Sequence, residues 1–230
     1  MIKIYYYDFK FWRFEVLKAG LFLQNIPFET VFDMGAMAKA PFNAFPLIEL
    51  EDGQILCQSQ AMATYVGKLG SSFDYVAAGV SAEKAAYARL YPADDDILAQ
   101  FRCDEIINGA NDVTNTVAGT FSTPQDQMAD LAAALIKPDG GRLFMHLKGL
   151  DSLLCKDSVD FACGKTLTVA DLAIWRFVAW FEGERIAFVP VEFPLPAGFI
   201  ESNFPNLQKI YTKVQENENV AEYVKAYYKE

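Results

Sequence analysis

The first eighty residues alternate between two hydrophobic patterns. Four short runs are rich in β-branched, aromatic and other apolar residues: 2–7, 27–32, 45–50 and 54–57. They predict four strands, and helical spacing of apolar residues over 13–23 predicts a helix between the first two. A strand–helix–strand unit favours a parallel pair, whereas the turn Glu51-Asp52-Gly53 favours an antiparallel hairpin. The sequence therefore predicts a mixed sheet.

Helical patterns dominate the rest of the chain. Ser59 opens one helix, and the Gly/Ser-rich stretch beginning at 70–72 is the best linker candidate. Further on, leucines form one apolar stripe at i, i+4, i+7 and i+11: Leu143, Leu147, Leu150 and Leu154. These patterns predict two domains, 1–78 with the mixed sheet and 79–230 with helices alone.

Three later helix starts complete this outline. Thr168-Val169-Ala170-Asp171 has the form of a capping box, with Thr168 as N-cap and Asp171 in place of the usual Glu. The apolar run that follows it continues to Phe181 on nearly all sides, which predicts a buried helix. Pro205 begins another helix, and 220–228 is the last.

Composition and charge exclude several classes of protein. The 230 residues are 52% hydrophobic, enough for a packed core, and the net charge of −10 argues against a nucleic-acid-binding protein. No apolar stretch approaches the ~20 residues that a membrane span needs, and the N-terminus lacks the pattern of a secretory signal. We therefore expect a protein that is neither secreted nor associated with a membrane.

Cysteine and histidine usage points the same way. The four cysteines are scattered without a Cys-x-x-Cys pair: Cys57, Cys103, Cys155 and Cys163. This pattern is typical of a reduced, intracellular protein rather than a disulfide framework. His146 is the only histidine, so a multi-histidine metal site is excluded, and we expect no metal.

Four local motifs, in order along the chain, carry a family resemblance. They are Pro41-Phe42-Asn43-Ala44-Phe45-Pro46-Leu47-Ile48-Glu49, Gln58-Ser59-Gln60-Ala61-Met62, Leu167-Thr168-Val169-Ala170-Asp171, and Phe204-Pro205-Asn206-Leu207 with Val220-Ala221-Glu222-Tyr223-Val224. Together they resemble a cytosolic glutathione transferase over essentially the whole chain. The resemblance implies an α/β thioredoxin-like N-terminal domain with a mixed four-stranded sheet, followed by an all-α C-terminal domain. It also implies a cytoplasmic homodimer that uses glutathione as co-substrate and needs no tightly bound cofactor.

Glutathione chemistry requires a group that stabilises a thiolate, because an ordinary thiol with a pKa near ~8.5 is mostly protonated at neutral pH. In the tyrosine-type classes that this chain resembles, the donor is a Tyr at the end of the first strand. Counting back from Arg13-Phe14-Glu15 without a gap selects Tyr7. Matching the run 3–8 to the family pattern selects Tyr6, which we favour because local similarity is greater. The alternative is that these aromatics are simply core residues.

The resemblance implies glutathione contacts at eight further positions: Gln58, Ser59, Phe45, Pro46, Lys39, Trp12, Arg13 and Asp95. A helix start at Ser59 offers unpaired N–H groups to the γ-glutamyl carboxylate, although Ser59 could be an N-cap alone. The Phe45-Pro46 step matches the family's cis-proline, which would turn the Phe45 backbone toward the cysteinyl part of glutathione; most X-Pro bonds are trans.

The other four assignments rest on position only. Lys39 could pair with the glycyl carboxylate, and Trp12 or Arg13 could line the same end, whereas a lone loop lysine is usually solvated. Asp95 matches a family Asp that reaches across a dimer interface, with a solvated acidic face as the alternative.

These residues predict a sigma-like, tyrosine-type glutathione transferase that conjugates the glutathione thiolate to hydrophobic electrophiles. The usual Arg-Gly after the catalytic Tyr is replaced by Lys10-Phe11 or Phe11-Trp12, and Ala44 stands where Gln or Lys is common. This bulkier loop keeps two alternatives open. One is a structural or binding protein of the same fold, resembling S-crystallins and elongation-factor subunits, and the other is a glutathione-dependent isomerase of the prostaglandin-synthase kind.

Overall fold

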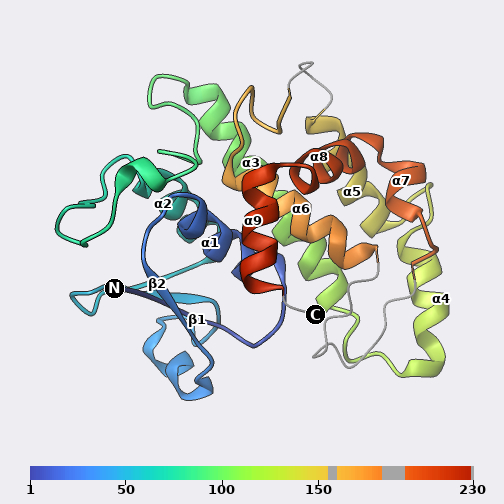
Figure 1. Ribbon diagram of the computed structural model, residues 1–230. Coiled ribbons are helices and arrows are strands. Elements are labelled where there is room, and N and C mark those ends of the chain that lie inside the picture. The colour runs from blue at the N-terminus through green and yellow to red at the C-terminus, as the bar shows by residue number, and fades with distance from the viewer. Residues whose placement is uncertain (155–159, 183–194, 229–230) are drawn as a thin grey trace.

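The computed structural model describes residues 1–154, 160–182 and 195–228. It places a four-stranded sheet and its helices at one end of the molecule and a cluster of helices at the other (Figure 1). The strands are β1 (Ile2–Tyr5), β2 (Phe28–Val31), β3 (Leu47–Glu49) and β4 (Ile55–Cys57). Their order is β2-β1-β3-β4, with β1 parallel to β2 and the other neighbours antiparallel. The mixed sheet predicted from the sequence is confirmed.

Side chains along and just after β1 alternate between two hydrophobic clusters, one on each face of the sheet. Ile4 and Tyr6 join the main hydrophobic core, which also contains α1 (Trp12–Leu23) and α2 (Ser59–Leu69). Tyr5 points to the other face and packs with Leu47 in a small cluster beneath the 3₁₀ helix η1 (Met34–Lys39). Neighbouring tyrosines thus face opposite sides because side chains alternate along a strand.

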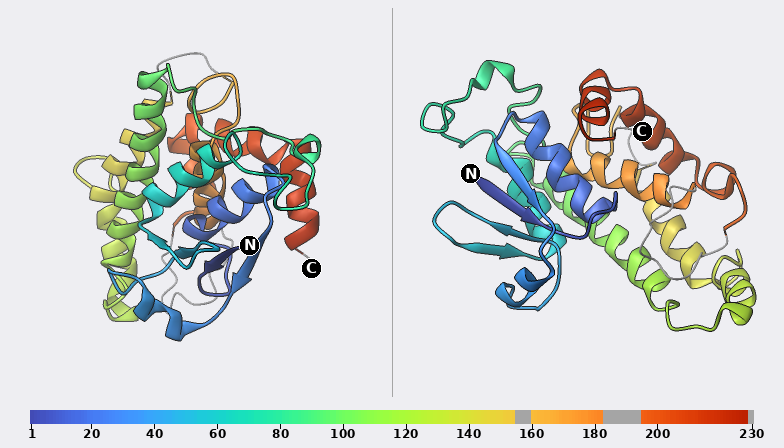
Figure 2. Two further views of the ribbon diagram at one scale, coloured as in Figure 1. Left: turned by 90° about the vertical axis from the view of Figure 1, so that its left-hand side faces the viewer. Right: turned by 60° about the horizontal axis from the view of Figure 1, so that its bottom comes forward.

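Within the described residues, seven helices follow a passage that contains the short 3₁₀ helix η2 (Ala82–Lys84), and Figure 2 shows them gathered away from the sheet. They are α3 (Ile97–Ala118), α4 (Gln125–Leu135), α5 (Arg142–Leu153), α6 (Val169–Phe181), α7 (Phe199–Asn203), α8 (Pro205–Gln215) and α9 (Glu218–Tyr227). Helix α6 lies at the centre, packed against α1, α3 and α8. Its buried position confirms the interpretation of its apolar run, and the four-leucine stripe on and just after α5 is buried as well. Among the described residues, no helix is both long and apolar enough to cross a bilayer.

The two halves are joined through backbone and side-chain hydrogen bonds. Leu90 donates its N–H to the Gly67 carbonyl of α2 at 2.8 Å and accepts from the Val169 N–H of α6 at 2.8 Å. A Cβ on Gly67 would lie 3.0 Å from the Leu90 carbonyl, so this close approach requires glycine. The passage before Leu90 also returns to α1, since Tyr87 donates its N–H to the Leu23 carbonyl at 3.1 Å. The division after residue 78 stays a prediction.

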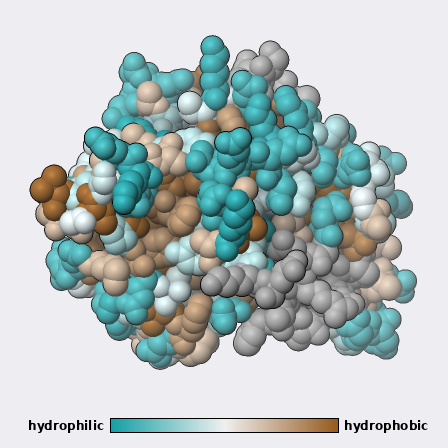
Figure 3. All heavy atoms as spheres, viewed as in Figure 1, coloured by the Kyte–Doolittle hydropathy of each residue, from teal (hydrophilic) through white to brown (hydrophobic). Residues whose placement is uncertain are grey.

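Hydrophobic side chains are unevenly spread over the surface. In the view of Figure 3 they gather left of centre, on the sheet-containing half, whereas the side chains over α9 are mostly hydrophilic. Among the described residues, Cys57, Cys103 and Cys163 are free cysteines. Cys155 lies outside the described residues.

Replacing Gln24 by alanine should destabilise the sheet-containing half. Gln24 is completely buried, and its amide donates to the Gly20 and Val66 carbonyls at 2.9 and 2.8 Å while accepting from the Gly70 N–H at 2.8 Å. Leaving such groups without partners costs about 2–3 kcal/mol of unfolding free energy, measurable by urea denaturation. The exposed Gln54→Ala is the control, with an expected change within about 0.5 kcal/mol. Equal losses in the two variants would contradict this assignment.

Candidate functional site

The strand register brings the predicted ligand-contacting segments to one end of the sheet. Tyr5 pairs with Leu47, and Leu47 pairs with Cys57 across the antiparallel ladders. The residues just beyond these pairs are therefore neighbours: the tyrosines after β1, Phe45 before β3, and Gln58 after β4. Three segments far apart in the sequence converge because β3 runs antiparallel to both of its neighbours.

Tyr6 is a buried phenol beside a cation. Its side chain is 5% exposed, and its ring stacks on Phe14 with centroids 5.2 Å apart. Burial raises the pKa of Tyr6 well above its ordinary value, and the nearby Arg13 guanidinium acts in the opposite direction. Among the described residues, the Tyr6 hydroxyl has no hydrogen-bond partner. A neutral phenol of this kind remains a proton donor over the whole physiological pH range.

Tyr7 lies half-buried next to the proline loop. Its ring meets the Phe45 ring edge-on with centroids 5.5 Å apart, and it stacks on Phe9 at 5.6 Å. The Phe45-Pro46 peptide bond is cis, as the family resemblance implied. Within the described part of the chain, the Phe45 N–H and carbonyl take part in no backbone hydrogen bond outside the regular ladders. Tyr5, by contrast, donates to Glu49 at 3.1 Å on the opposite face of the sheet.

The start of α2 presents unpaired backbone donors. Gln58, not Ser59, is the N-cap, and its side chain makes no capping hydrogen bond. Its backbone has φ = 76°, an unusual value for a residue with a side chain, and such outliers gather at ligand-contacting positions. The first intrahelical bond closes at the Met62 N–H, so the N–H groups at the start of the helix are left for another acceptor. Ser59, at the first helical position, is half-buried beside them.

Trp12 and Arg13 connect the sheet-containing half to α3. Trp12 has no exposed surface, and its indole N–H donates to Thr114 Oγ1 at 2.9 Å. Arg13 donates from Nη2 to Asn115 Oδ1 at 3.2 Å, and burial lowers the pKa of its guanidinium. Its buried Nε has no partner among the described residues, so Arg13 retains a donor close to Tyr6.

Lys39 and Asp95 are the two remaining candidates. Lys39 is bound to Glu49 at 2.8 Å, and that hydrogen bond is the main reason why the pKa of Lys39 is raised. Asp95 lies exposed in the turn before α3, between Asp94, which pairs with Arg89, and Asp96, which caps the helix. The role expected for Asp95 lies across a dimer interface, so it stays a prediction.

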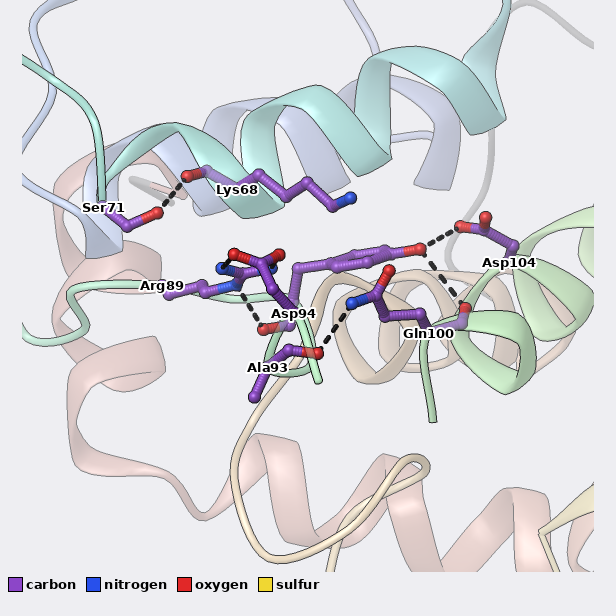
Figure 4. A network of polar contacts seen from close by, with 8 residues as sticks. Lys68, Ser71, Arg89, Ala93, Asp94, Gln100 and Asp104 are labelled. Carbon is purple, nitrogen blue, oxygen red and sulfur yellow. Dashed lines mark hydrogen bonds and ion pairs between the residues drawn. The ribbon is translucent and has the colours of Figure 1, made fainter. Parts of the chain in front are cut away.

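A carboxylate that the sequence did not single out links α2 to α3. Asp104 Oδ1 accepts from the Thr64 hydroxyl and the Tyr91 hydroxyl, each at 2.9 Å, and Gln60 donates to Thr64 at 3.2 Å. The Tyr91 hydroxyl also contacts the Gln100 carbonyl at 3.2 Å, and Figure 4 shows Asp104 and Gln100 on α3 in this arrangement. Through Thr64 and Gln60 the network reaches the first turn of α2, so Asp104 helps to fix the helix whose start offers free donors. In the same described residues, no three His, Cys, Asp or Glu side chains gather to hold a metal ion.

Comparison with known proteins identifies the family. Residues 111–227, half of the chain, match the family model described as "Glutathione S-transferase, C-terminal domain". The chain belongs to the cytosolic glutathione transferase family. A "Glutathione S-transferase" of Plasmodium yoelii yoelii is 27% identical over 170 residues, which cover 73% of this chain and 67% of that protein.

Solved structures of this family share the fold. The glutathione S-transferase from Ascaris lumbricoides has a TM-score of 0.66 at 20% identity, covering 98% of this chain and 97% of the other. Prostaglandin synthase D of Nilaparvata lugens has a TM-score of 0.67 at 14% identity, covering 99% and 98% of the two chains. The thioredoxin-like N-terminal half and the all-helical C-terminal domain predicted from the sequence are confirmed.

Proposed function

We propose that this chain is a tyrosine-type, sigma-like glutathione transferase that conjugates the glutathione thiolate to hydrophobic electrophiles. One observation carries the proposal: the sheet register gathers the phenols of Tyr6 and Tyr7, the Phe45 backbone and the start of α2 at one end of the sheet. These groups are chemically suited to the sulfur, the peptide backbone and the γ-glutamyl carboxylate of glutathione, in that order.

The binding part of the proposal uses backbone groups. A carboxylate at the start of α2 meets unpaired N–H groups and the positive end of the helix dipole, to which the Ser59 hydroxyl and Gln58 amide add neutral donors. The unpaired Phe45 backbone accepts the cysteinyl residue like an added strand, next to the Tyr7 ring. Lys39 reaches the glycyl carboxylate only by leaving or sharing Glu49.

The chemical part of the proposal assigns stabilisation of the glutathione thiolate to the Tyr6 hydroxyl. Lowering a thiol pKa by about two units requires ~2.7 kcal/mol of differential interaction, which a hydroxyl donor beside a cation can supply. Tyr6 has the uncommitted hydroxyl, and Arg13 is the adjacent cation. The thiol proton passes to solvent, the thiolate forms a C–S bond with the electrophilic carbon, and the leaving group departs with its bonding electrons.

A homodimer and a cytoplasmic location complete the proposal. Large apolar side chains lie exposed along α3 and α5: Ile97, Leu98, Phe101 and Met145. Phe101 and Met145 border a groove of about 480 Å³ between these helices, and covering it with a second copy would remove this apolar surface from water. Sedimentation analysis tests the dimer.

Conjugation of glutathione to a generic aryl halide tests the activity. We expect the purified protein to be retained on immobilised glutathione and to form the thioether product in proportion to enzyme. Absence of glutathione binding at millimolar concentration would overturn the proposal in favour of a structural protein of this fold. Glutathione binding with turnover of a prostaglandin-type endoperoxide, but with no thioether from any electrophile, would replace transfer by isomerisation.

A further inference from the structure

The loop between β1 and α1 carries the aromatic residue on which both candidate phenols pack. The Phe9 ring lies 5.3 Å from the Tyr6 ring and 5.6 Å from the Tyr7 ring, measured between centroids. Two short backbone bonds shape this loop: the Phe9 N–H donates to the Tyr7 carbonyl at 2.9 Å, and the Phe11 N–H donates to the Phe9 carbonyl at 3.0 Å. The position of the phenols therefore depends on what holds the loop in place.

Arg176 of α6 and Tyr228, just after α9, both contact the loop at Lys10. The guanidinium of Arg176, in the central helix α6, donates from Nη2 to the Lys10 carbonyl at 3.3 Å. The Lys10 ammonium lies 4.2 Å from the centroid of the Tyr228 ring, just after α9, and Arg176 Cζ lies 5.0 Å from the same centroid. The Tyr228 ring thus contacts two cations, the Lys10 ammonium on the loop and the Arg176 guanidinium of α6.

A buried carboxylate fixes Tyr228 in this position. Glu15 of α1 is 1% exposed, and its Oε2 accepts from the Tyr228 hydroxyl and, at 2.7 Å, from the Tyr223 hydroxyl. Its Oε1 accepts from Lys18 Nζ at 3.2 Å. A buried carboxylate requires such donors, since leaving it unpaired is costly. The segment around Tyr228 is therefore attached to α1 at Glu15, which follows the two phenols closely in the sequence.

We propose that Tyr228 and Arg176 are positioning residues for the phenols. Tyr228 is anchored on the buried Glu15 carboxylate, and Arg176 binds the Lys10 carbonyl. Together they hold the loop that sets the phenols against the glutathione sulfur. This inference rests on the proposed function for its catalytic consequence. Its structural part, the attachment of the loop to the C-terminal segment, does not. The glutathione backbone is held elsewhere, by Phe45 and the start of α2, so these two residues act on the thiol and not on affinity for the peptide.

Tyr228→Phe tests the structural part, with Tyr227→Phe as a matched control. The first change removes the hydroxyl that donates to Glu15 and keeps the ring, while Tyr227 is 42% exposed and packs on Phe22 and Phe28. Amide hydrogen exchange at Phe9 and Phe11 should become about fivefold faster in Tyr228→Phe and stay unchanged in Tyr227→Phe. Equal exchange in both variants would overturn the proposal, whether or not the protein binds glutathione.

The pH dependence of kcat/KM tests the catalytic part. In Tyr228→Phe the acid limb should move up by about half a pH unit, with KM for glutathione within about twofold of the wild type, because a misplaced phenol stabilises the thiolate less. A purely structural role would lower thermal stability and leave this profile unmoved, which would contradict the proposal. Arg176→Lys keeps the charge but loses the planar donor, and we expect the same upward shift.

These experiments distinguish failure of the proposed function from failure of the positioning role. Wild-type protein that binds no glutathione would contradict the proposed function, while the exchange measurement still decides whether Tyr228 holds the loop. Wild-type protein that is active, with an unaltered pH profile in both Tyr228→Phe and Arg176→Lys, would leave the function standing and overturn the positioning role.

Discussion

Replacing Tyr6 by phenylalanine should lower kcat/KM for glutathione conjugation at neutral pH by about 10- to 100-fold. The change deletes one hydroxyl donor, and a hydrogen bond to a charged acceptor contributes about 1.5–3 kcal/mol. The Tyr6 hydroxyl has no partner among the described residues, so nothing within them loses a hydrogen bond when it is removed. The lost rate should return at high pH, because the unassisted thiol then ionises by itself. Initial rates over a range of pH values measure both effects.

Tyr7→Phe is the matched control for this experiment. Tyr7 is the adjacent residue, undergoes the same change and lies half-buried against Phe45 and Phe9, which the phenylalanine ring preserves. We expect less than a threefold change in kcat/KM for it. If the tenfold loss instead followed Tyr7→Phe, the gap-free alignment to Arg13 would be correct and the donor would be Tyr7. If neither change slowed the reaction tenfold, the tyrosine mechanism would be wrong.

Local patterns were enough to predict the sheet and the buried helix α6, whereas the site residues came from the family resemblance. Runs of β-branched, aromatic and other apolar residues predict the strands, and the Glu51-Asp52-Gly53 turn predicts the hairpin. The Thr168–Asp171 capping box specifies a helix start through residues only three positions apart. Helix α4 was not predicted, because only Met128 and Ala132 of its eleven residues are buried and its apolar stripe is therefore weak.

Contacts between residues far apart in the chain could not be predicted from the sequence. Trp12 is enclosed because Thr114, 102 residues away, accepts its indole N–H, and no local pattern reveals that partner. Gln58 takes the N-cap position that Ser59 could have held, because its backbone turns to a positive φ at the end of β4. A signal did exist for Arg176, since a charged residue inside an otherwise apolar buried helix needs a buried partner. The partner's identity, the Lys10 carbonyl, required the fold.

Replacing Asp171 by alanine should cost about 4 kcal/mol of unfolding free energy, an unusually large value for one side chain. Asp171 has no exposed surface, and its carboxylate accepts from the Ala162 N–H at 2.6 Å, the Thr168 N–H at 2.8 Å and the Thr168 hydroxyl at 2.6 Å. Alanine leaves three buried donors without an acceptor. Asp96→Ala is the control, because Asp96 caps α3 at an exposed site through one bond to the Ala99 N–H and should cost about 1 kcal/mol.

The pH dependence of this loss has a definite sign. Burial raises the pKa of Asp171 from 3.8 to about 6 despite its three hydrogen bonds, so the folded state binds a proton that the unfolded chain has released. Between pH 4 and 6 this carboxyl therefore makes the protein less stable as pH rises, by up to about 3 kcal/mol. The wild type should exceed Asp171→Ala in unfolding free energy by more at pH 4 than at pH 7, as urea titrations of both proteins would measure. A larger difference at pH 7 would mean that the three donors outweigh burial and hold the carboxylate ionised.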